Sequence, residues 1–211
     1  MDKSTQLDTF NRFARVSRET ISSLNRYENL LLEANKGLNL IGKSTINDIW
    51  IRHFLDSAQV IDLINENDKS IVDVGSGAGL PGVVLAILLK SRKNLLKVTL
   101  IEKSPKKVAF LREVNKKLQL DMNIVNENIF DMENNLDYDL ITSRAFKPIE
   151  IFLPLIHKKT KKFKKIFYFL GKTGKSELLQ ASKNWNIEYK QRKSVTSDDS
   201  IIVEINKLEK K

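Results

Sequence analysis

The chain lacks several residue types that would otherwise open common chemistries. Its 211 residues include no cysteine and only two histidines, His53 and His157, far apart in sequence. Disulfides, thiolate metal sites and reactions that need a cysteine nucleophile are therefore excluded, and we expect no metal site. No apolar run approaches the roughly 18 residues that a membrane-spanning helix needs. The first four residues contain no apolar signal core, which predicts a cytoplasmic protein without a membrane partner.

Acidic residues are also in the minority. Lysine and arginine number 36 against 26 aspartates and glutamates, giving a net charge of +10. Such an excess favours a polyanionic partner, nucleic acid above all, although lysine-rich composition or simple solubility can produce the same excess. The charge is clustered, which favours nucleic acid. One cluster contains Lys103, Lys106, Lys107 and Arg112, and residues 157–165 form a second, equally typical of a solvated loop.

The order of apolar patterns predicts the fold. Residues 5–36 carry apolar residues at helical spacing with Gly37 as a stop, and 46–64 predict one or two more helices with Ser44 or Thr45 as cap. A polar break at 65–69 separates this N-terminal helical extension, 1–66, from a second domain, 67–211. Length and an apolar content of 41% allow one main domain with a sizeable core.

From residue 70 onward strand-like and helix-like runs alternate. Strands are predicted at 70–74, 97–102, 123–125, 138–143, 164–170, 186–191 and 200–206, and helices at 80–91, 105–119, 148–160 and 174–184. This alternation predicts an α/β fold, a Rossmann-like doubly wound and mostly parallel sheet. The last two strands, separated by a short polar loop (194–200), are expected to form an antiparallel hairpin. No large apolar surface signal indicates a dimer, so we expect a monomer.

A glycine-rich turn is the most informative segment. Residues 71–82 read IVDVGSGAGLPG, with Gly75, Gly77 and Gly79 between two apolar runs. Such a strand, tight turn and helix N-terminus typically bind a nucleotide-like ligand. The third glycine comes one residue earlier than in the dinucleotide fingerprint. With Asp73 two residues before Gly75, the turn resembles motif I of the class I S-adenosylmethionine-dependent methyltransferases, whose fold usually ends in an antiparallel hairpin.

A second acidic residue follows the next predicted strand. The run Val98 to Ile101 ends in Glu102. A carboxylate can accept two hydrogen bonds from a ribose diol, so Glu102 is the candidate that grips the ribose of the cofactor.

The fourth predicted strand end carries Arg144 where enzymes that methylate exocyclic amines commonly have an Asn/Asp-Pro-Pro-aromatic motif. Arginine binds phosphate or a base edge but cannot act as a base at neutral pH. This favours a nucleophile that needs no deprotonation, such as guanine N7, with alignment as the main source of catalysis. The alternative is that Arg144 only forms an ion pair in a loop.

Three segments together resemble the RsmG (GidB) family of bacterial 16S ribosomal RNA guanine-N7 methyltransferases. They are Arg52-His53-Phe54-Leu55-Asp56-Ser57 preceded by Asn39-Leu40, the stretch Asp73 to Gly82, and Ser143-Arg144-Ala145-Phe146. The resemblance covers nearly the whole chain. It implies S-adenosyl-L-methionine as cofactor, the small ribosomal subunit as partner, and methylation of a guanine in the 530-loop region of its RNA.

The same resemblance implies site residues. The cofactor set consists of Asp73, Gly75, Gly77, Gly79, Leu80, Glu102, Lys103, Ser104, Ile129, Phe130 and Arg144. Arg144 is also the candidate catalytic residue, positioning substrate and cofactor. The RNA-binding candidates are Arg52 and His53 of the first motif together with Lys106, Lys107 and Arg112, which come from the basic cluster and not from the resemblance. We expect His53 and Asp56 to be structural, orienting the N-terminal region over the site.

The sequence leaves two other classes of protein open. One is a class I methyltransferase that acts on a protein or a small molecule, which the basic clusters disfavour. The other is a dinucleotide oxidoreductase or a non-catalytic nucleotide-binding module, which the glycine spacing disfavours. The sequence does not distinguish naked RNA, an assembly intermediate and the intact subunit as substrate.

Overall fold

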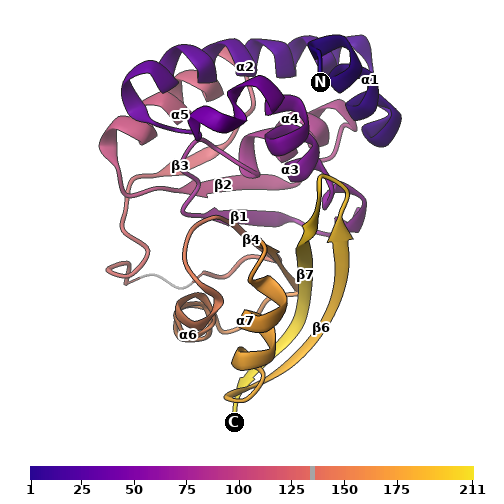
Figure 1. Ribbon diagram of the computed structural model, residues 1–211. Coiled ribbons are helices and arrows are strands. Elements are labelled where there is room, and N and C mark those ends of the chain that lie inside the picture. Colours follow the sequence, from indigo (N-terminus) through magenta and orange to yellow (C-terminus); the bar gives the residue numbers. More distant parts are fainter. Residues whose placement is uncertain (134–135) are drawn as a thin grey trace.

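A computed structural model describes residues 1–133 and 136–211. Its centre is a seven-stranded sheet in the order β3-β2-β1-β4-β5-β7-β6 (Figure 1). The strands are β1 (Ser70–Val74), β2 (Lys97–Ile101), β3 (Asn123–Val125), β4 (Leu140–Arg144), β5 (Lys165–Leu170), β6 (Trp185–Ser194) and β7 (Ser197–Lys210). The first five run parallel, and β7 joins β5 and β6 antiparallel. The predicted doubly wound fold with a C-terminal hairpin is confirmed.

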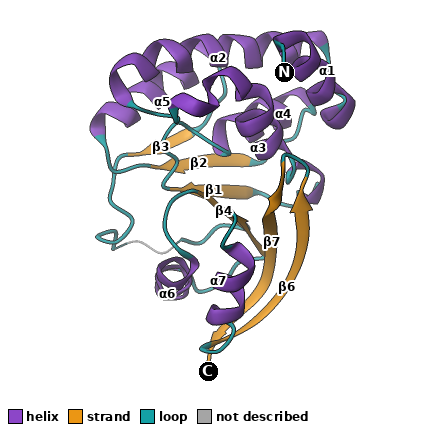
Figure 2. Cartoon of the chain, in the orientation of Figure 1, coloured by secondary structure: helices purple, strands orange, loops and turns teal. Residues whose placement is uncertain are grey.

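Helices cover both faces of this sheet (Figures 1 and 2). The helices on one face are α1 (Lys3–Ala14), α2 (Arg18–Leu38), α4 (Gly82–Ser91) and α5 (Pro105–Leu118). The other face carries α6 (Ile149–Lys159) and α7 (Gly174–Ala181). Strand β1 shows why two layers form: Ile71 points into the first core, whereas Val72 and Val74 point into the second. A strand that is apolar on both sides must be covered on both sides. In the described part of the chain, no helix is both long and apolar enough to cross a membrane.

The N-terminal region differs from the predicted single helical run. Arg15 adopts a left-handed conformation (φ 48°) that ends α1, and the side chain of Ser17 then caps α2. The predicted stop at Gly37 is wrong, because α2 continues to Leu38 and ends at Asn39, also left-handed. An isolated glycine can be tolerated inside a helix, so it is a weak stop signal.

Residues 43–63 form four short helical segments where one or two helices were predicted. They are a 3-10 helix η1 (Lys43–Asp48), a π-helix η2 (Trp50–Leu55), a short α3 (Asp56–Ala58) and a 3-10 helix η3 (Ile61–Leu63). Trp50 and Phe54 are buried edge-to-face against each other at 5.1 Å, so tertiary packing shapes this segment. Neither Ser44 nor Thr45 caps a helix here; the residue before η1 is Gly42.

The division into 1–66 and 67–211 stays a prediction. Phe10, Leu24 and Trp50 from the first part belong to the same hydrophobic core as Val84 and Leu111 from the second. The N-terminal helices therefore pack as part of one layer over the sheet.

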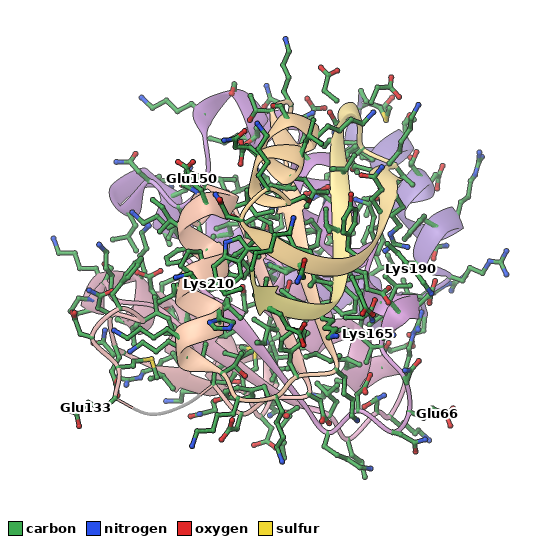
Figure 3. The ribbon with its side chains drawn as sticks, turned by 90° about the horizontal axis from the view of Figure 1, so that it is seen from below. Glu66, Glu133, Glu150, Lys165, Lys190 and Lys210 are labelled. Atoms are coloured by element: carbon green, nitrogen blue, oxygen red, sulfur yellow. The ribbon has the colours of Figure 1, made fainter. Side chains whose placement is uncertain are left out.

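The C-terminal hairpin is longer than predicted, and its turn is only Val195 and Thr196, not a loop of 194–200. Residues 188–193 of β6 lie at the sheet edge, and all but the half-buried Arg192 are exposed, so the sequence there lacks the apolar–polar alternation that marks a strand. Figure 3, seen from below, shows Lys190 of β6 and Glu150 of α6 at the periphery. The basic run 157–165 connects α6 to the start of β5, at the sheet edge opposite the strand carboxyl ends.

Candidate active site

A cavity of about 610 Å³ opens at the carboxyl ends of β1, β2 and β4. Eight of the predicted cofactor residues line it: Gly75, Gly77, Leu80, Glu102, Lys103, Ile129, Phe130 and Arg144. Its volume is in the range usual for small-molecule sites. Ligands of open α/β sheets bind at this edge. This cavity is therefore the candidate cofactor site.

The glycine-rich turn lets neighbouring groups lie close to its backbone. Gly75, Gly77 and Gly79 all have positive φ, at 72°, 56° and 92°. A Cβ on Gly75 would lie 2.2 Å from the ring of Phe146, and one on Gly79 would lie 2.4 Å from Val83. A Cβ on Gly77 would meet only a carbonyl oxygen at 3.9 Å. Gly75 and Gly79 are thus required for packing, while Gly77 keeps space open beside the cavity.

Asp73 lies beneath this turn. Its Oδ2 accepts a hydrogen bond from the backbone N–H of Gly82 at 3.0 Å, at the N-terminus of α4. Burial, the largest cause, raises the pKa of this carboxyl to about 7. Below the turn, the Tyr27 hydroxyl donates to the carbonyl of Ala78 at 2.7 Å. Asp73, Gly79 and Ser104 do not line the cavity, so their direct cofactor contact stays a prediction.

Glu102 connects the turn to the end of β2. Its Oε2 accepts from the N–H of Gly77 at 3.0 Å, and its Oε1 accepts from the N–H of Ser104 at 2.8 Å. A carboxylate offers about four acceptor positions, so lone pairs remain for a ribose diol. Sequence reasoning missed Asn126, whose side chain donates to the carbonyls of Glu102 and Lys103. Its position just after β3 was the available signal.

Two aromatic rings lie together at the other side of the cavity. The rings of Phe130 and Phe146 are 6.2 Å apart, and Phe130 is 42% exposed. Ile129 beside them is buried. Flat apolar surfaces of this kind suit a purine ring. With the open space at Gly77 and the carboxylate of Glu102, the residues present fit S-adenosylmethionine.

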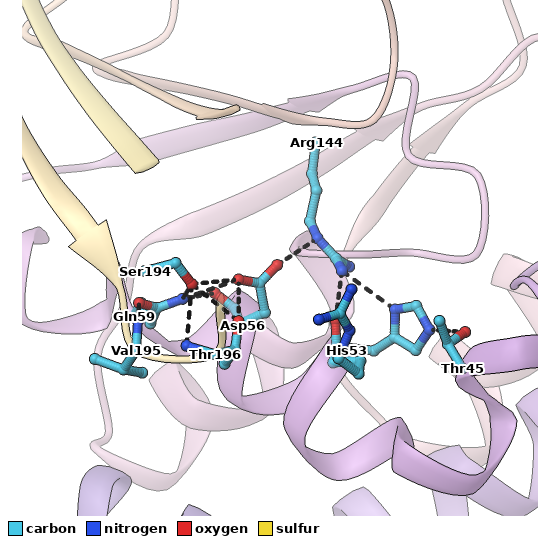
Figure 4. Close-up of polar contacts among 9 residues, drawn as sticks. Thr45, His53, Asp56, Gln59, Arg144, Ser194, Val195 and Thr196 are labelled. Atoms are coloured by element: carbon cyan, nitrogen blue, oxygen red, sulfur yellow. Dashed lines mark hydrogen bonds and ion pairs between the residues drawn. The ribbon is translucent and has the colours of Figure 1, made fainter. Parts of the chain in front are cut away.

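Arg144 lies at the boundary of the cavity and holds three groups of the N-terminal region (Figure 4). Its Nε pairs with Oδ2 of Asp56 at 2.7 Å, and both side chains are about 15% exposed. Its Nη2 donates to the backbone carbonyl of Arg52 at 2.6 Å and to Nδ1 of His53 at 3.2 Å. The first and third sequence motifs are therefore one hydrogen-bonded unit.

The π-helix makes one of these contacts possible. In a regular α-helix the N–H of Asp56 would donate to the carbonyl of Arg52. In η2 it donates instead to the carbonyls of Ile51 and His53. The carbonyl of Arg52 is thereby available to Arg144, consistent with the frequent occurrence of π-turns at functional sites.

His53 is neutral in this arrangement. Burial lowers its pKa to about 3, and the positive charges of Arg144 and Arg52 act in the same direction. Since Nδ1 accepts from Arg144, Nε2 carries the proton and donates to the hydroxyl of Thr45 at 2.8 Å. Thr45 in turn donates to the carbonyl of Gly42, which lines the cavity.

Asp56 extends the unit to the C-terminal hairpin. Its Oδ1 accepts from Gln59 at 2.9 Å, from Thr196 at 2.9 Å and from Ser194 at 3.2 Å (Figure 4). With Arg144 on Oδ2, both oxygens are occupied by protein donors. Asp56 therefore holds Arg144, Gln59 and the hairpin turn in place.

The predicted RNA-binding residues separate in space. Lys107 and His53 line the cofactor cavity, whereas Arg52 lines a smaller neighbouring cavity. Lys106 and Arg112 are exposed on α5 outside both. Their contact with RNA stays a prediction. Sequence reasoning also missed Ile41 and Gly42 in the cavity wall, although the neighbouring Asn39-Leu40 pair was noted. No trio of histidine, aspartate or glutamate side chains within 1–133 and 136–211 is placed to hold a metal ion.

Solved structures support the fold. TrmK from M. capricolum, in complex with S-adenosyl-homocysteine, is 21% identical with a TM-score of 0.54, over 72% of this chain and 67% of that one. An O-methyltransferase from Bacillus cereus, also in complex with S-adenosyl-homocysteine, is 15% identical with a TM-score of 0.52, over 86% and 91%. The sheet order and this site define a class I S-adenosylmethionine-dependent methyltransferase.

Sequence comparison identifies the family. Residues 20–203 match the model of GidB, rRNA small subunit methyltransferase G. A ribosomal RNA small subunit methyltransferase G from Pelagibacter ubique is 41% identical over 198 residues, 93% of this chain and 92% of its relative. One from Bartonella tribocorum is 35% identical, over 92% and 90%. The chain belongs to the GidB family of rRNA small subunit methyltransferases, and S-adenosylmethionine is its cofactor.

Proposed function

We propose that this protein methylates N7 of a guanine in the 530-loop region of 16S ribosomal RNA, acting in the cytoplasm as a monomer. The carrying observation is the state of Arg144 and His53 beside the cofactor cavity. The guanidinium group of Arg144 cannot accept a proton. The pKa of His53 is lowered to about 3, so its ring is too weak a base to take a proton from a substrate at neutral pH. Guanine N7 has a free lone pair and requires no base.

When bound, S-adenosylmethionine would supply an electrophilic methyl group on a positively charged sulfur, which a neutral guanine N7 can accept without losing a proton. The protein's part is then positioning. Glu102 holds the turn and would accept from the ribose, Phe130 and Phe146 would contact the purine, and the Arg144 unit would fix the wall toward the substrate.

The test uses S-adenosylmethionine labelled in its methyl group and small subunits that lack guanine-N7 methylation. Digestion of the RNA and mass analysis of its nucleosides should give labelled 7-methylguanosine. Label in another nucleoside would refute the N7 assignment, and no label in RNA would refute the substrate. Naked 16S RNA and partially assembled particles, run in parallel, identify the form that is methylated, and light scattering gives the oligomeric state.

A further inference from the structure

A second cavity lies next to the cofactor cavity and shares Arg144 and Ala145 with it. Its volume is about 200 Å³, a third of that of its neighbour. It opens at the carboxyl end of β5 and the start of β7, lined by Phe169, Gly171 and the serines and threonine of the hairpin turn. It therefore lies at the ligand edge of the sheet, one strand further on.

The walls of this cavity are held by specific contacts. The backbone N–H of Val195 donates to Oε1 of Gln59 at 2.7 Å, and Nε2 of Gln59 donates to Oγ of Ser194 at 3.1 Å. Asp56 accepts from Thr196 and from Arg144, which both line the cavity. The hairpin turn is therefore locked to the same unit that borders the cofactor cavity (Figure 4).

Many of the side chains that line this cavity are polar, and Asp56 is the acidic residue among them. Both oxygens of Asp56, the carboxylate in the wall, are already used by the protein. The hydroxyls of Ser197 and Ser200 form no hydrogen bond with any residue that the structure describes. A hydroxyl can donate or accept, which matches the mixed N–H and carbonyl edge of guanine. Phe169 adds an aromatic ring, and Arg52 a cation suited to a flanking phosphate.

The backbone at the shared wall is unusual. Ala145 has a φ of 51°, a left-handed conformation that a residue with a Cβ rarely adopts. At this bend the chain leaves β4, with Arg144 held toward Asp56 and Phe146 lying over Gly75 in the cofactor turn. Strain of this kind persists where surrounding contacts fix it, typically at functional sites.

From these observations we propose that the 200 Å³ cavity, which shares Arg144 and Ala145 with the cofactor cavity, holds the target guanine base, turned out of the RNA. The inference rests on the proposed RNA methyltransferase function. Enzymes that modify a base inside folded RNA need such a pocket for the extruded nucleotide. Arg144 and Ala145 are then the boundary across which N7 approaches the methyl group.

The test fills the cavity without touching its hydrogen-bonded walls. At Gly171, which lines the cavity, a Cβ meets no heavy atom of the described residues within 4 Å and φ is not left-handed, so the backbone tolerates the side chain of Gly171→Phe. Ser200→Phe is a second, independent filling variant. Gly37→Phe is the matched control, since Gly37 also has no heavy atom within 4 Å of its Cβ and lies in α2, away from both cavities.

Both filling variants should lower kcat/KM for small subunits by about 100-fold, because a base that is displaced by an ångström reacts far more slowly. The Kd for S-adenosylmethionine, the melting temperature and the salt-dependent affinity for the subunit should stay near wild type, since phosphate contacts are separate from the base contact. Gly37→Phe should methylate normally. Normal methylation by both filling variants would overturn the inference while leaving the proposed function intact. A wild-type enzyme that labels no RNA would overturn both.

Discussion

The Nε of Arg144 lies 2.7 Å from Oδ2 of Asp56, and this contact joins the last residue of β4 to the short helix α3. Each side chain also holds other groups: Arg144 the carbonyl of Arg52 and the ring of His53, Asp56 the hairpin turn. Arg144 lines both candidate binding cavities, and Asp56 lines the smaller one. The pair thus links the N-terminal region, the central sheet and the C-terminal hairpin.

Replacing Asp56 by asparagine should weaken both stability and turnover. The charge of Arg144 would lose its carboxylate in a largely buried site, lowering the free energy of unfolding by about 1–3 kcal/mol. Urea unfolding and methylation rates on small subunits measure the two effects. Glu33→Gln is the control, since its exposed pair with Lys36 should change stability by less than about 0.5 kcal/mol. An Asp56→Asn variant with wild-type stability and rate would contradict this role.

His53 should make the protein sensitive to mild acid. Its pKa is about 3 when folded and near 6.5 when unfolded, so the unfolded chain binds more protons between these values. Its stabilising contribution is complete above pH 6.5 and falls as the pH drops toward 3, by about 1 kcal/mol per unit. Urea unfolding at pH 7, 6 and 5 should show a smaller decline in His53→Asn than in wild type. The same substitution at exposed His157 controls for removing a histidine; equal slopes in all three proteins would refute the role of His53.

Gly77 and Gly75 should respond differently to alanine. At Gly77 a methyl group enters open space at a left-handed φ, so the variant should fold with a loss of about 1–2 kcal/mol and bind S-adenosylmethionine more weakly. At Gly75 the methyl group would overlap the Phe146 ring, so stability should fall further. Calorimetric titration and thermal melting separate the two. Unchanged cofactor affinity in Gly77→Ala would exclude close contact at this position.

Lys107 should contact RNA phosphate, whereas the run 157–165 should not. Lys107 lines the cofactor cavity, while Lys161 is exposed at the far edge of the sheet. Lys107→Gln should reduce the slope of log affinity against log salt by about 0.7–0.9, the value for one phosphate contact, and Lys161→Gln should leave it unchanged. Filter binding of 16S RNA from 50 to 200 mM salt measures this. The reverse result would move the RNA surface to the other side of the sheet.

The sheet, the glycine-rich turn and the place of Glu102 at the end of β2 could be predicted from the sequence. These features depend on contacts between residues near in sequence: an apolar run before Gly75, or Glu102 at the end of its own strand. In such segments the spacing of apolar residues and the residues typical of turns predict the secondary structure directly. For the basic run 157–165, composition allows both RNA binding and a solvated loop, and the structure adds only that the run lies between α6 and the start of β5, at the sheet edge opposite the strand carboxyl ends.

The contacts among His53, Asp56 and Arg144 could not be predicted from the sequence. As single residues, each is equally typical of a surface pair or a functional group. Their meaning comes from contacts across the fold: a π-turn that exposes the carbonyl of Arg52, a strand end that brings Arg144 to it, and a hairpin turn that reaches Asp56. Local sequence does not encode these distances, because they arise when separate elements pack on a common core and their polar groups must then find partners.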